Sequence, residues 1–233
     1  MVDSKTSFKQ KNIIIAIDGP AASGKSTVAQ IIAQKLNFLY IDSGAMYRAL
    51  TWKVIQNNID LDNLKNLEEF LKNTHLFLKK GSPLKVYIDG QDITDQIRDP
   101  VIDHCISKVA KNSAFRKAMV ELQRSYHQDN HIAMDGRDIG TVVFPWADFK
   151  FYLEANLEIR AQRRYQELIA KGKKLSLEEV TKEMEHRDQE DLTRVIGPLR
   201  CAEDAIKVNT SDFSIDEVSS LVLNHILKKG INL

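Results

Sequence analysis

The chain has 233 residues, of which 43% are hydrophobic and 28% are charged, and its formal net charge is +1. This length and apolar content are sufficient to bury the core of one α/β domain that carries insertions. A charge so close to zero provides no overall field to attract nucleic acid or an anionic membrane, so neither is expected as a partner.

Residues 1–11 lack the apolar segment of a secretory signal, and no later stretch approaches the roughly 18 apolar residues of a membrane span. We therefore expect a flexible tail over residues 1–11, a single domain over residues 12–233 and a cytoplasmic location. Cys105 and Cys201 match no metal-ligand spacing and are too few for a disulfide framework, which also fits a reducing compartment. We further expect a monomer.

The first predicted strand, Ile13–Ile17, leads into a glycine-rich loop that opens a helix. The loop has the spacing G-x-x-x-x-G-K-S, which in this context predicts a cradle for nucleotide phosphates rather than an accidental turn. Lys25 supplies a positive charge, the Ser26 hydroxyl is placed to reach Mg²⁺, and the helix directs its positive dipole end at the phosphates. The predicted cradle consists of Gly19, Pro20, Ala21, Ala22, Ser23, Gly24, Lys25, Ser26 and Thr27.

Strand patterns recur along the chain, with helical patterns between them. This alternation predicts an α/β fold in which a five-stranded parallel sheet is flanked by helices, with ligands at the carboxyl ends of the strands. The other predicted strands are Phe38–Ile41, His131–Met134, Phe149–Leu153 and Ile206–Val208.

Two regions interrupt the alternation. Residues 57–100 contain a short amphipathic stretch and then a β-like series with a turn signal at Asp89-Gly90, so we expect an inserted antiparallel subdomain with strands at His75–Leu78, Leu84–Ile88 and Gln91–Thr94. Residues 156–200 are highly charged and helical in pattern, with a break at Lys171–Lys174. Such a helical hairpin is either a solvated surface or a mobile lid.

Arginines occur in motifs that the predicted sheet brings together. On an unbroken helix, Arg187, Asp191 and Arg194 share one face, and Gly197-Pro198 would then stop the helix. A structural ladder of ion pairs would give the same pattern. The conjunction with a phosphate cradle favours function, because transfer of a phosphoryl group between two anionic substrates needs several cations around the transferred group.

Two more motifs follow predicted strands. After the second strand, Asp42 or Ser43 can cap a helix that carries Arg48, which is also consistent with an ordinary cap and an exposed arginine. After the third strand, a turn places Arg137 and Asp138 together, although a solvated turn would look the same.

These motifs together resemble the bacterial cytidylate kinases over about residues 12–229. The loop Gly19–Thr27, the segment Asp42–Arg48, the stretch Ile132–Pro145 and the spacing R-D-x-x-D-x-x-R from Arg187 to Arg194 occur in that family's order. The resemblance implies a P-loop kinase that phosphorylates CMP and dCMP with ATP and Mg²⁺. It also implies that the insertion at 57–100 binds the acceptor. From the helical pattern we expect residues 156–200 to form a helical lid.

The resemblance further implies roles for individual residues. Contacts to cytosine are implied for Ser107, Arg116 and Asp138, contacts to ribose for Arg187 and Asp191, and contacts to phosphate for Ser43, Arg48, Arg137 and Arg194. Lys25, Arg137 and Arg194 would act in catalysis. An Asp138 carboxylate that accepts from the cytosine N4 amino group would disfavour uracil, whose O4 is also an acceptor.

The chain departs from the family pattern in three places. It has Ala22-Ser23 where many relatives have Gly-Ala, Glu190 where some have arginine, and Lys111–Phe115 in place of a turn with proline. Glu190 makes the lid less positive than in relatives that have arginine there, and it is not counted in the expected site.

Two other functions remain possible from the residues alone. A P-loop kinase for a neutral hydroxyl acceptor would need a carboxylate base, for which Asp42 or Asp138 could serve. A regulatory ATP-binding module would need no lid arginines. Four separate motifs that carry arginine fit a phosphate acceptor better than either alternative.

Overall fold

A parallel β-sheet forms the centre of the molecule in the computed structural model, which describes residues 12–79, 81 and 84–229. The five strands have the order β2-β6-β1-β7-β8, and every neighbouring pair is parallel. The strands are β1 (Ile14–Asp18), β2 (Leu39–Asp42), β6 (Ile132–Gly136), β7 (Phe149–Glu154) and β8 (Ile206–Asn209). The predicted sheet is confirmed, whereas the tail predicted over residues 1–11 lies outside the described residues.

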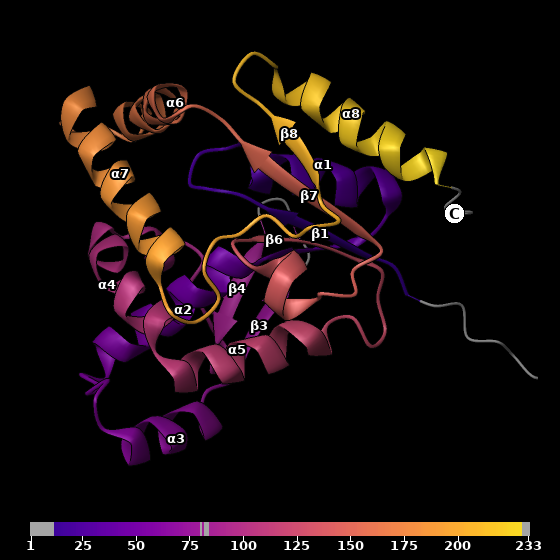
Figure 1. Ribbon diagram of the computed structural model, residues 1–233. Coiled ribbons are helices and arrows are strands. Elements are labelled where there is room, and N and C mark those ends of the chain that lie inside the picture. Colours follow the sequence, from indigo (N-terminus) through magenta and orange to yellow (C-terminus); the bar gives the residue numbers. More distant parts are fainter. Residues whose placement is uncertain (1–11, 80, 82–83, 230–233) are drawn as a thin grey trace, which may run out of the picture.

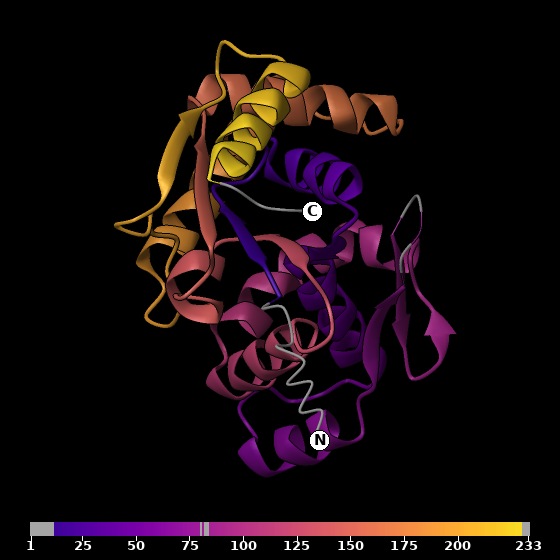
Figure 2. The ribbon, with the colours of Figure 1, turned by 90° about the vertical axis from the view of Figure 1, so that its right-hand side faces the viewer.

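Helices cover both faces of the sheet because its central strand is apolar on both sides. Ile14 and Ala16 of β1 belong to one buried cluster, and Ile15 and Ile17 belong to the other. Helices α1 and α8 pack against each other on the second of these faces (Figure 2). The first face is covered by α2 and α5. The bounds are α1 (Lys25–Leu36), α2 (Ser43–Gln56), α5 (Ser113–Ser125) and α8 (Ile215–Lys228).

The insertion adds a second, smaller sheet beside α2. Its three strands are antiparallel, in the order β3-β4-β5, and their buried residues face α2 and α5. Asp89 and Gly90 form the turn between β4 and β5 with φ of 50° and 83°, as the Asp-Gly signal predicts. The elements are α3 (Leu64–Lys72), β3 (Leu76–Lys79), β4 (Lys85–Ile88), β5 (Gln91–Asp92), a 3₁₀ turn (Gln96–Arg98) and α4 (Pro100–Lys111).

The last predicted strand of the insertion, Gln91–Thr94, is shorter than expected. It ends at Asp92 because the Asp92 side chain accepts hydrogen bonds from the Thr94 backbone and hydroxyl, which turns the chain. Part of the loop between β3 and β4, at Ser82 and Pro83, lies outside the described residues.

The segment predicted to form a lid, residues 156–200, is called the lid segment below. It contains two helices, α6 (Leu157–Ala170) and α7 (Leu177–Thr193), joined by a turn at the predicted break. A capping box at Ser176 and Glu179 starts α7. The pair has a small core of its own around Ala161, Val180 and Met184, and α7 runs from α6 toward α4 (Figure 1). None of the helices described here is both long and apolar enough to cross a membrane.

Asn112 links α4 to α5. Its side chain accepts hydrogen bonds from the backbone N–H groups of Ala114 and Phe115 and donates to the Leu61 carbonyl at 3.0 Å. We expect Asn112→Ala to lower the free energy of unfolding by about 1–2 kcal/mol, because the first turn of α5 loses its cap. Urea denaturation measures this change. Asn112→Asp keeps the capping oxygen but loses the donor to the Leu61 carbonyl, so it should lose less stability than Asn112→Ala, and an Asn112→Ala variant as stable as the wild type would contradict the capping explanation.

Candidate active site

The glycine-rich loop lies at the carboxyl end of β1 and ends at the first turn of α1. A Cβ on Gly19 would lie 2.1 Å from the Leu153 carbonyl oxygen of the neighbouring strand β7, so only glycine fits there. Gly24 caps α1 with φ of 88° and offers no side-chain acceptor. The first N–H groups of α1 are therefore available to an anion.

Ala22, one of the departures from the family pattern, adopts a left-handed conformation with φ of 56°. Glycine would adopt it without the steric cost that a Cβ adds. The Ala22 side chain packs instead against the small core of the lid segment, together with Ala21. The loop and the lid are thus in contact.

Lys25 is buried, and its Nζ donates to the Pro20 carbonyl at 3.0 Å. Burial, and after it the positive charge of Arg137, lowers the pKa of Lys25 to about 7. An anion bound beside Lys25 would stabilise its charged form, which burial and Arg137 disfavour. The position of Lys25 therefore suits the phosphates of a bound nucleotide.

This pKa predicts a pH dependence of donor binding. Bound phosphates favour the charged form of Lys25 and raise its pKa above about 7, so ATP binding near pH 7.5 is expected to take up protons. The affinity for ATP should accordingly fall as the pH rises from 7 to 9. Titration calorimetry in buffers of different ionisation enthalpy measures the uptake, and a Lys25→Met variant that takes up as many protons as the wild type would contradict this assignment.

Asp135, at the carboxyl end of β6, is a site residue that sequence reasoning did not assign. It accepts hydrogen bonds from the Ser26 hydroxyl at 2.7 Å and from the Tyr40 hydroxyl at 2.9 Å. Burial, and after it the charge of Asp42, raises the pKa of Asp135 to about 6. Its signal in the sequence is an acidic residue directly after the apolar run Ile132–Met134.

Ser43 begins α2 and lies against the same strand end. Its hydroxyl donates to the Asp135 carbonyl at 2.6 Å, and a Cβ on Gly136 would lie 2.7 Å from Ser43 Oγ. Asp42 caps the helix by accepting from the Ala45 N–H at 2.8 Å. The predicted cap is confirmed, and Ser43 contacts Asp135, the residue that also holds Ser26 of the glycine-rich loop.

The predicted arginines converge, and each is paired with a carboxylate. Arg137 Nε donates to Asp191 at 2.6 Å, and Arg194 Nη1 lies 3.6 Å from the other oxygen of Asp191. Arg48 on α2 forms an ion pair with Asp103 on α4, from which Arg187 Nη1 lies 3.9 Å away. These pairs join α2, α4, α7 and the β6 edge. The conjunction of motifs predicted that the arginines would meet, whereas Asp103 on α4 was not predicted.

Arg194 corrects one expectation. The prediction placed it on an unbroken helix that stops at Gly197, but α7 ends at Thr193 and Arg194 is extended, with φ and ψ of −60° and 139°. The chain turns early because the Leu199 N–H donates to the Asp191 carbonyl at 2.7 Å and Arg194 Nε donates to the Gly197 carbonyl. The Arg194 side chain still reaches the site, since Nη2 lies 3.7 Å from Asp138 Oδ1.

Arg116 and Asp138, both predicted to contact a base, form a buried ion pair. Within the described part of the chain, Arg116 Nε and Nη1 have no hydrogen-bond partner. Buried donors of this kind cost free energy until a ligand satisfies them. Gly197 lies directly on the pair, because a Cβ there would meet Arg116 Nη2 at 2.1 Å.

Ser107 on α4, the third predicted base contact, faces α7. Its hydroxyl donates to Glu190 Oε2 at 2.9 Å. Glu190, left out of the expected site, is thus in contact with a residue of that site.

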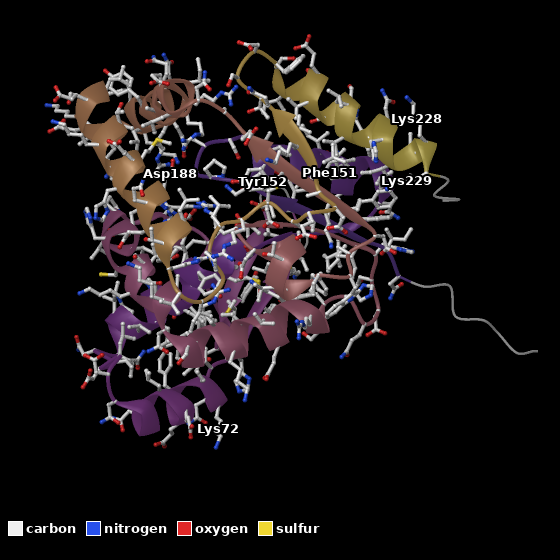
Figure 3. All side chains as sticks on the ribbon, in the orientation of Figure 1. Lys72, Phe151, Tyr152, Asp188, Lys228 and Lys229 are labelled. Carbon is white, nitrogen blue, oxygen red and sulfur yellow. The ribbon has the colours of Figure 1, made fainter. Side chains whose placement is uncertain are left out.

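The lid segment also contacts the glycine-rich loop. Arg160 on α6 forms an ion pair of 2.6 Å with Asp188 on α7 and donates to the Ala21 carbonyl at 3.3 Å. Figure 3 shows Asp188 on the side of α7 that faces the body of the protein. Arg160 and Asp188 therefore connect both lid helices to the loop at Gly19–Thr27.

A hollow of about 280 Å³ beside the start of α1 was not predicted. Its volume is close to the roughly 300 Å³ at which ligand pockets begin. Phe213 contributes an exposed ring, and Arg163 is held by hydrogen bonds to Thr210. The lining residues are Ser23, Gly24, Val28, Arg163, Thr210, Phe213, Ser214, Ile215 and Val218.

Comparisons with known proteins agree with this arrangement. The family model of cytidylate kinase matches residues 15–228. A cytidylate kinase of Geobacillus sp. (strain WCH70) is 47% identical over 215 residues, which are 92% of this chain and 96% of that protein. One of Listeria monocytogenes serotype 4a (strain HCC23) is 46% identical over 214 residues, again 92% and 96%.

A solved structure of shikimate kinase from Acinetobacter baumannii in complex with shikimate is a weaker match, with 14% identity, a TM-score of 0.47 and coverage of 95% of this chain and 96% of that one. The family match and the two relatives, which extend over nearly the whole chain, are far stronger. The chain belongs to the cytidylate kinase family of nucleoside monophosphate kinases.

Proposed function

We propose that the protein transfers the γ-phosphoryl group of ATP to CMP and dCMP, which yields ADP with CDP or dCDP. The observation that carries this proposal is the meeting of a buried phosphate cradle at Lys25 with the arginine pairs of α2, β6 and α7. Lys25 offers a cation to the phosphates of the donor nucleotide. The arginines offer cations to the phosphate of the acceptor nucleotide, which is itself an anion.

The donor half uses the backbone N–H groups of the loop Gly19–Thr27, except that of Pro20, which has none, together with the charge of Lys25 and the hollow beside α1. A nucleobase in that hollow would lie against the Phe213 ring and the Arg163 side chain. The hollow and the cradle share Ser23 and Gly24, so one nucleotide can occupy both.

The residues beside the cradle fit Mg²⁺. The Ser26 hydroxyl and the Asp135 carboxylate are hard oxygen groups held 2.7 Å apart, of the kind that Mg²⁺ and its bound waters prefer. Mg²⁺, when bound, offsets the negative charge of the β- and γ-phosphates. Asp135 holds Ser26 in place and supplies the carboxylate, and Tyr40 fixes the Asp135 carboxylate from its other side.

Asp135→Asn tests the metal assignment. We expect the Mg²⁺ concentration for half-maximal activity to rise about 10–100-fold, because the carboxylate charge is lost while its shape remains. Activity titrated with MgCl₂ at saturating ATP and CMP gives this value. Asp129→Asn, at an exposed position, is the control and should leave the curve unchanged. An Asp135→Asn curve that superimposes on the control would remove Asp135 from the metal site.

In the acceptor half, we assign phosphate binding to Ser43, Arg48, Arg137 and Arg194, ribose binding to Arg187 and Asp191, and cytosine binding to Ser107, Arg116 and Asp138. The unpartnered nitrogens of Arg116 support the last assignment, since cytosine O2 and N3 are acceptors. The insertion at 57–100 would hold α4 and its Asp103 in position beside Arg48.

The reaction needs no general base, because the acceptor is already an anionic phosphate oxygen. Catalysis is then positioning and electrostatic stabilisation. Lys25 holds the donor phosphates, and Arg137 and Arg194 offset the charge on the transferred group. Their present partners, Asp191 and Asp138, are released in part when substrate phosphates take their place.

The lid segment would exclude water from the transferred group and so suppress hydrolysis of ATP. Its contacts to the P-loop through Arg160 and to α4 through Glu190 describe a closed position. We propose that release of these contacts admits the substrates.

We also propose that the protein acts as a monomer in the cytoplasm, where its nucleotide substrates are. Cys105 and Cys201 are free thiols, which fits a reducing compartment. Light scattering after gel filtration measures the oligomeric state.

The test of the proposed function is release of ADP from Mg-ATP across a panel of nucleoside monophosphates. CMP and dCMP are expected to give higher kcat/KM than AMP or UMP. If kcat/KM for AMP or UMP is much higher than for CMP and dCMP, the assignment of the base is wrong and the protein is a kinase of another nucleoside monophosphate. ATP hydrolysis that does not respond to any monophosphate would indicate a regulatory module instead.

A further inference from the structure

Glu190 on α7 holds two side chains of α4. Its Oε2 accepts from the Ser107 hydroxyl at 2.9 Å, and its Oε1 accepts from Lys111 Nζ at 2.5 Å. Ser107 and Lys111 are one helical turn apart, so a single carboxylate bridges neighbouring positions on the face of α4 that meets the lid. His186 Nδ1 lies 3.8 Å from Oε2.

The carboxylate is ionised at neutral pH. Partial burial raises the pKa of Glu190, but the hydrogen bonds from Lys111 and Ser107 outweigh it and hold the pKa below its usual range. An ionised carboxylate can only accept hydrogen bonds. The proton of the Ser107 hydroxyl must therefore point at Glu190.

A hydroxyl with its proton committed in this way keeps only its lone pairs for a ligand. Toward a base, Ser107 is then an acceptor and not a donor. The cytosine amino group at N4 is a donor, whereas the oxygen at C4 of uracil is an acceptor. Opposite C4 of the base, which is where the proposal requires Ser107 to lie, the same hydroxyl would accept a hydrogen bond from cytosine N4, and it would face uracil O4 as one acceptor against another.

We propose that Glu190 is a positioning residue for base specificity, which orients the Ser107 hydroxyl so that the acceptor site favours cytosine over uracil. The inference rests on the proposed function and on the assignment of Ser107 to the base. It adds a residue that does not touch the substrate and acts through another.

The location of Glu190 also couples specificity to closure. Because Glu190 belongs to α7 and Ser107 to α4, the hydroxyl is oriented only when the lid segment lies against the acceptor side, as in Figure 1. The site would therefore discriminate between cytosine and uracil only when the lid segment closes and water is excluded.

The test compares Glu190→Gln with the wild type for CMP and UMP. Glutamine has the same shape, but its amide can donate to Ser107 and so free the hydroxyl proton to reach the uracil oxygen. We expect the ratio of kcat/KM for CMP to that for UMP to fall about tenfold, with the Ki of UMP as a competitive inhibitor against CMP falling in parallel. Glu185→Gln, at an exposed position of the same helix, should keep the wild-type ratio.

A double variant separates positioning from a merely structural contact. In a Ser107→Ala background, adding Glu190→Gln should change the CMP/UMP ratio no further, because the hydroxyl through which Glu190 acts is gone. If Glu190→Gln lowers kcat/KM equally for CMP and UMP, or leaves their ratio at the wild-type value, the inference is overturned. CMP turnover by the wild type would still uphold the proposed function in that case. A wild type that prefers UMP would overturn both, and melting curves verify that each variant is folded.

Discussion

Replacing Lys25 with methionine is expected to lower kcat for CMP phosphorylation by about 10³-fold or more at saturating substrates. The loss reflects removal of a fixed positive charge from a water-excluded site where phosphate charge is redistributed. Lys25 is only 7% exposed, so methionine, which has a similar length and no charge, occupies the same space. The steady-state rate of ADP formation measures the effect.

The same variant has a second readout that excludes unfolding as the cause. The pKa of Lys25 is lower in the folded protein than in the unfolded chain, so the charged lysine reduces the free energy of unfolding. This reduction is present in full below pH 7, and it disappears above the unfolded pKa of about 10.4, where the lysine is neutral in both states. Lys25→Met is therefore expected to melt at or above the wild-type temperature at pH 7, with the advantage shrinking toward pH 10. Lys35→Met, exposed on the same helix, should change neither rate nor stability. A folded Lys25→Met enzyme with kcat within tenfold of wild type would contradict the assignment.

The central sheet was predictable because its physics is local. A strand buried on both faces must be apolar throughout, and β1 with four buried hydrophobic residues shows this pattern in the sequence. The predicted ends were short by one or two residues at Asp18, Asp42 and Gly136. These residues are polar or small, yet they continue the ladder because the parallel register pairs Asp18 with Gly136 and Asp42 with Asp135.

The partners of the site residues were not predictable, since they come from distant parts of the chain. Arg48 meets Asp103 across 55 residues, and Ser107 meets Glu190 across 83. Periodicity describes one helix at a time and does not see such pairs. It also assumes that the helix continues, which is why Arg194 was placed on α7 when backbone contacts of Asp191 and Gly197 end the helix one residue before it.

Asp135 shows a different limit. The motif around it was recognised for Arg137 and Asp138, whose charges stand out in a turn, while Asp135 looked like the end of a strand. Its role depends on two hydroxyls, Ser26 from α1 and Tyr40 from β2, which only the order of the strands brings to one carboxylate. Strand order follows from the whole fold and not from any single segment.

In this structure the acceptor side is neutralised by the protein's own carboxylates. Asp103, Asp138 and Asp191 lie against the arginines that we assign to the substrate phosphates and base. Substrate binding is then an exchange of anions rather than the filling of an uncompensated positive cavity. Such an arrangement keeps the arginines ordered before the substrate arrives, which lowers the entropy cost of positioning them during the reaction.

Arg194→Met is expected to lower kcat by about 10²–10⁴-fold, by analogy with other arginines that act on a transferred phosphoryl group. Its side chain is 7% exposed, and its guanidinium lies between Asp138 and Asp191, at distances of 3.7 Å and 3.6 Å. Removal leaves both carboxylates with other partners, Arg116 and Arg137 respectively. The ground-state site therefore stays paired, and the KM for CMP should change far less than kcat.

The division between kcat and KM is what distinguishes a catalytic arginine from a structural one. An arginine that only joined α7 to the loop at Gly197 would, when removed, loosen the base pocket and raise the KM for CMP with little effect on kcat. Arg194→Lys should recover part of the lost rate, because the charge returns while the planar set of donors does not. Arg200→Met, at an exposed position of the following segment, is the control for a change of charge alone. An unchanged kcat in Arg194→Met would remove Arg194 from the mechanism and leave Lys25 and Arg137 to neutralise the transferred group.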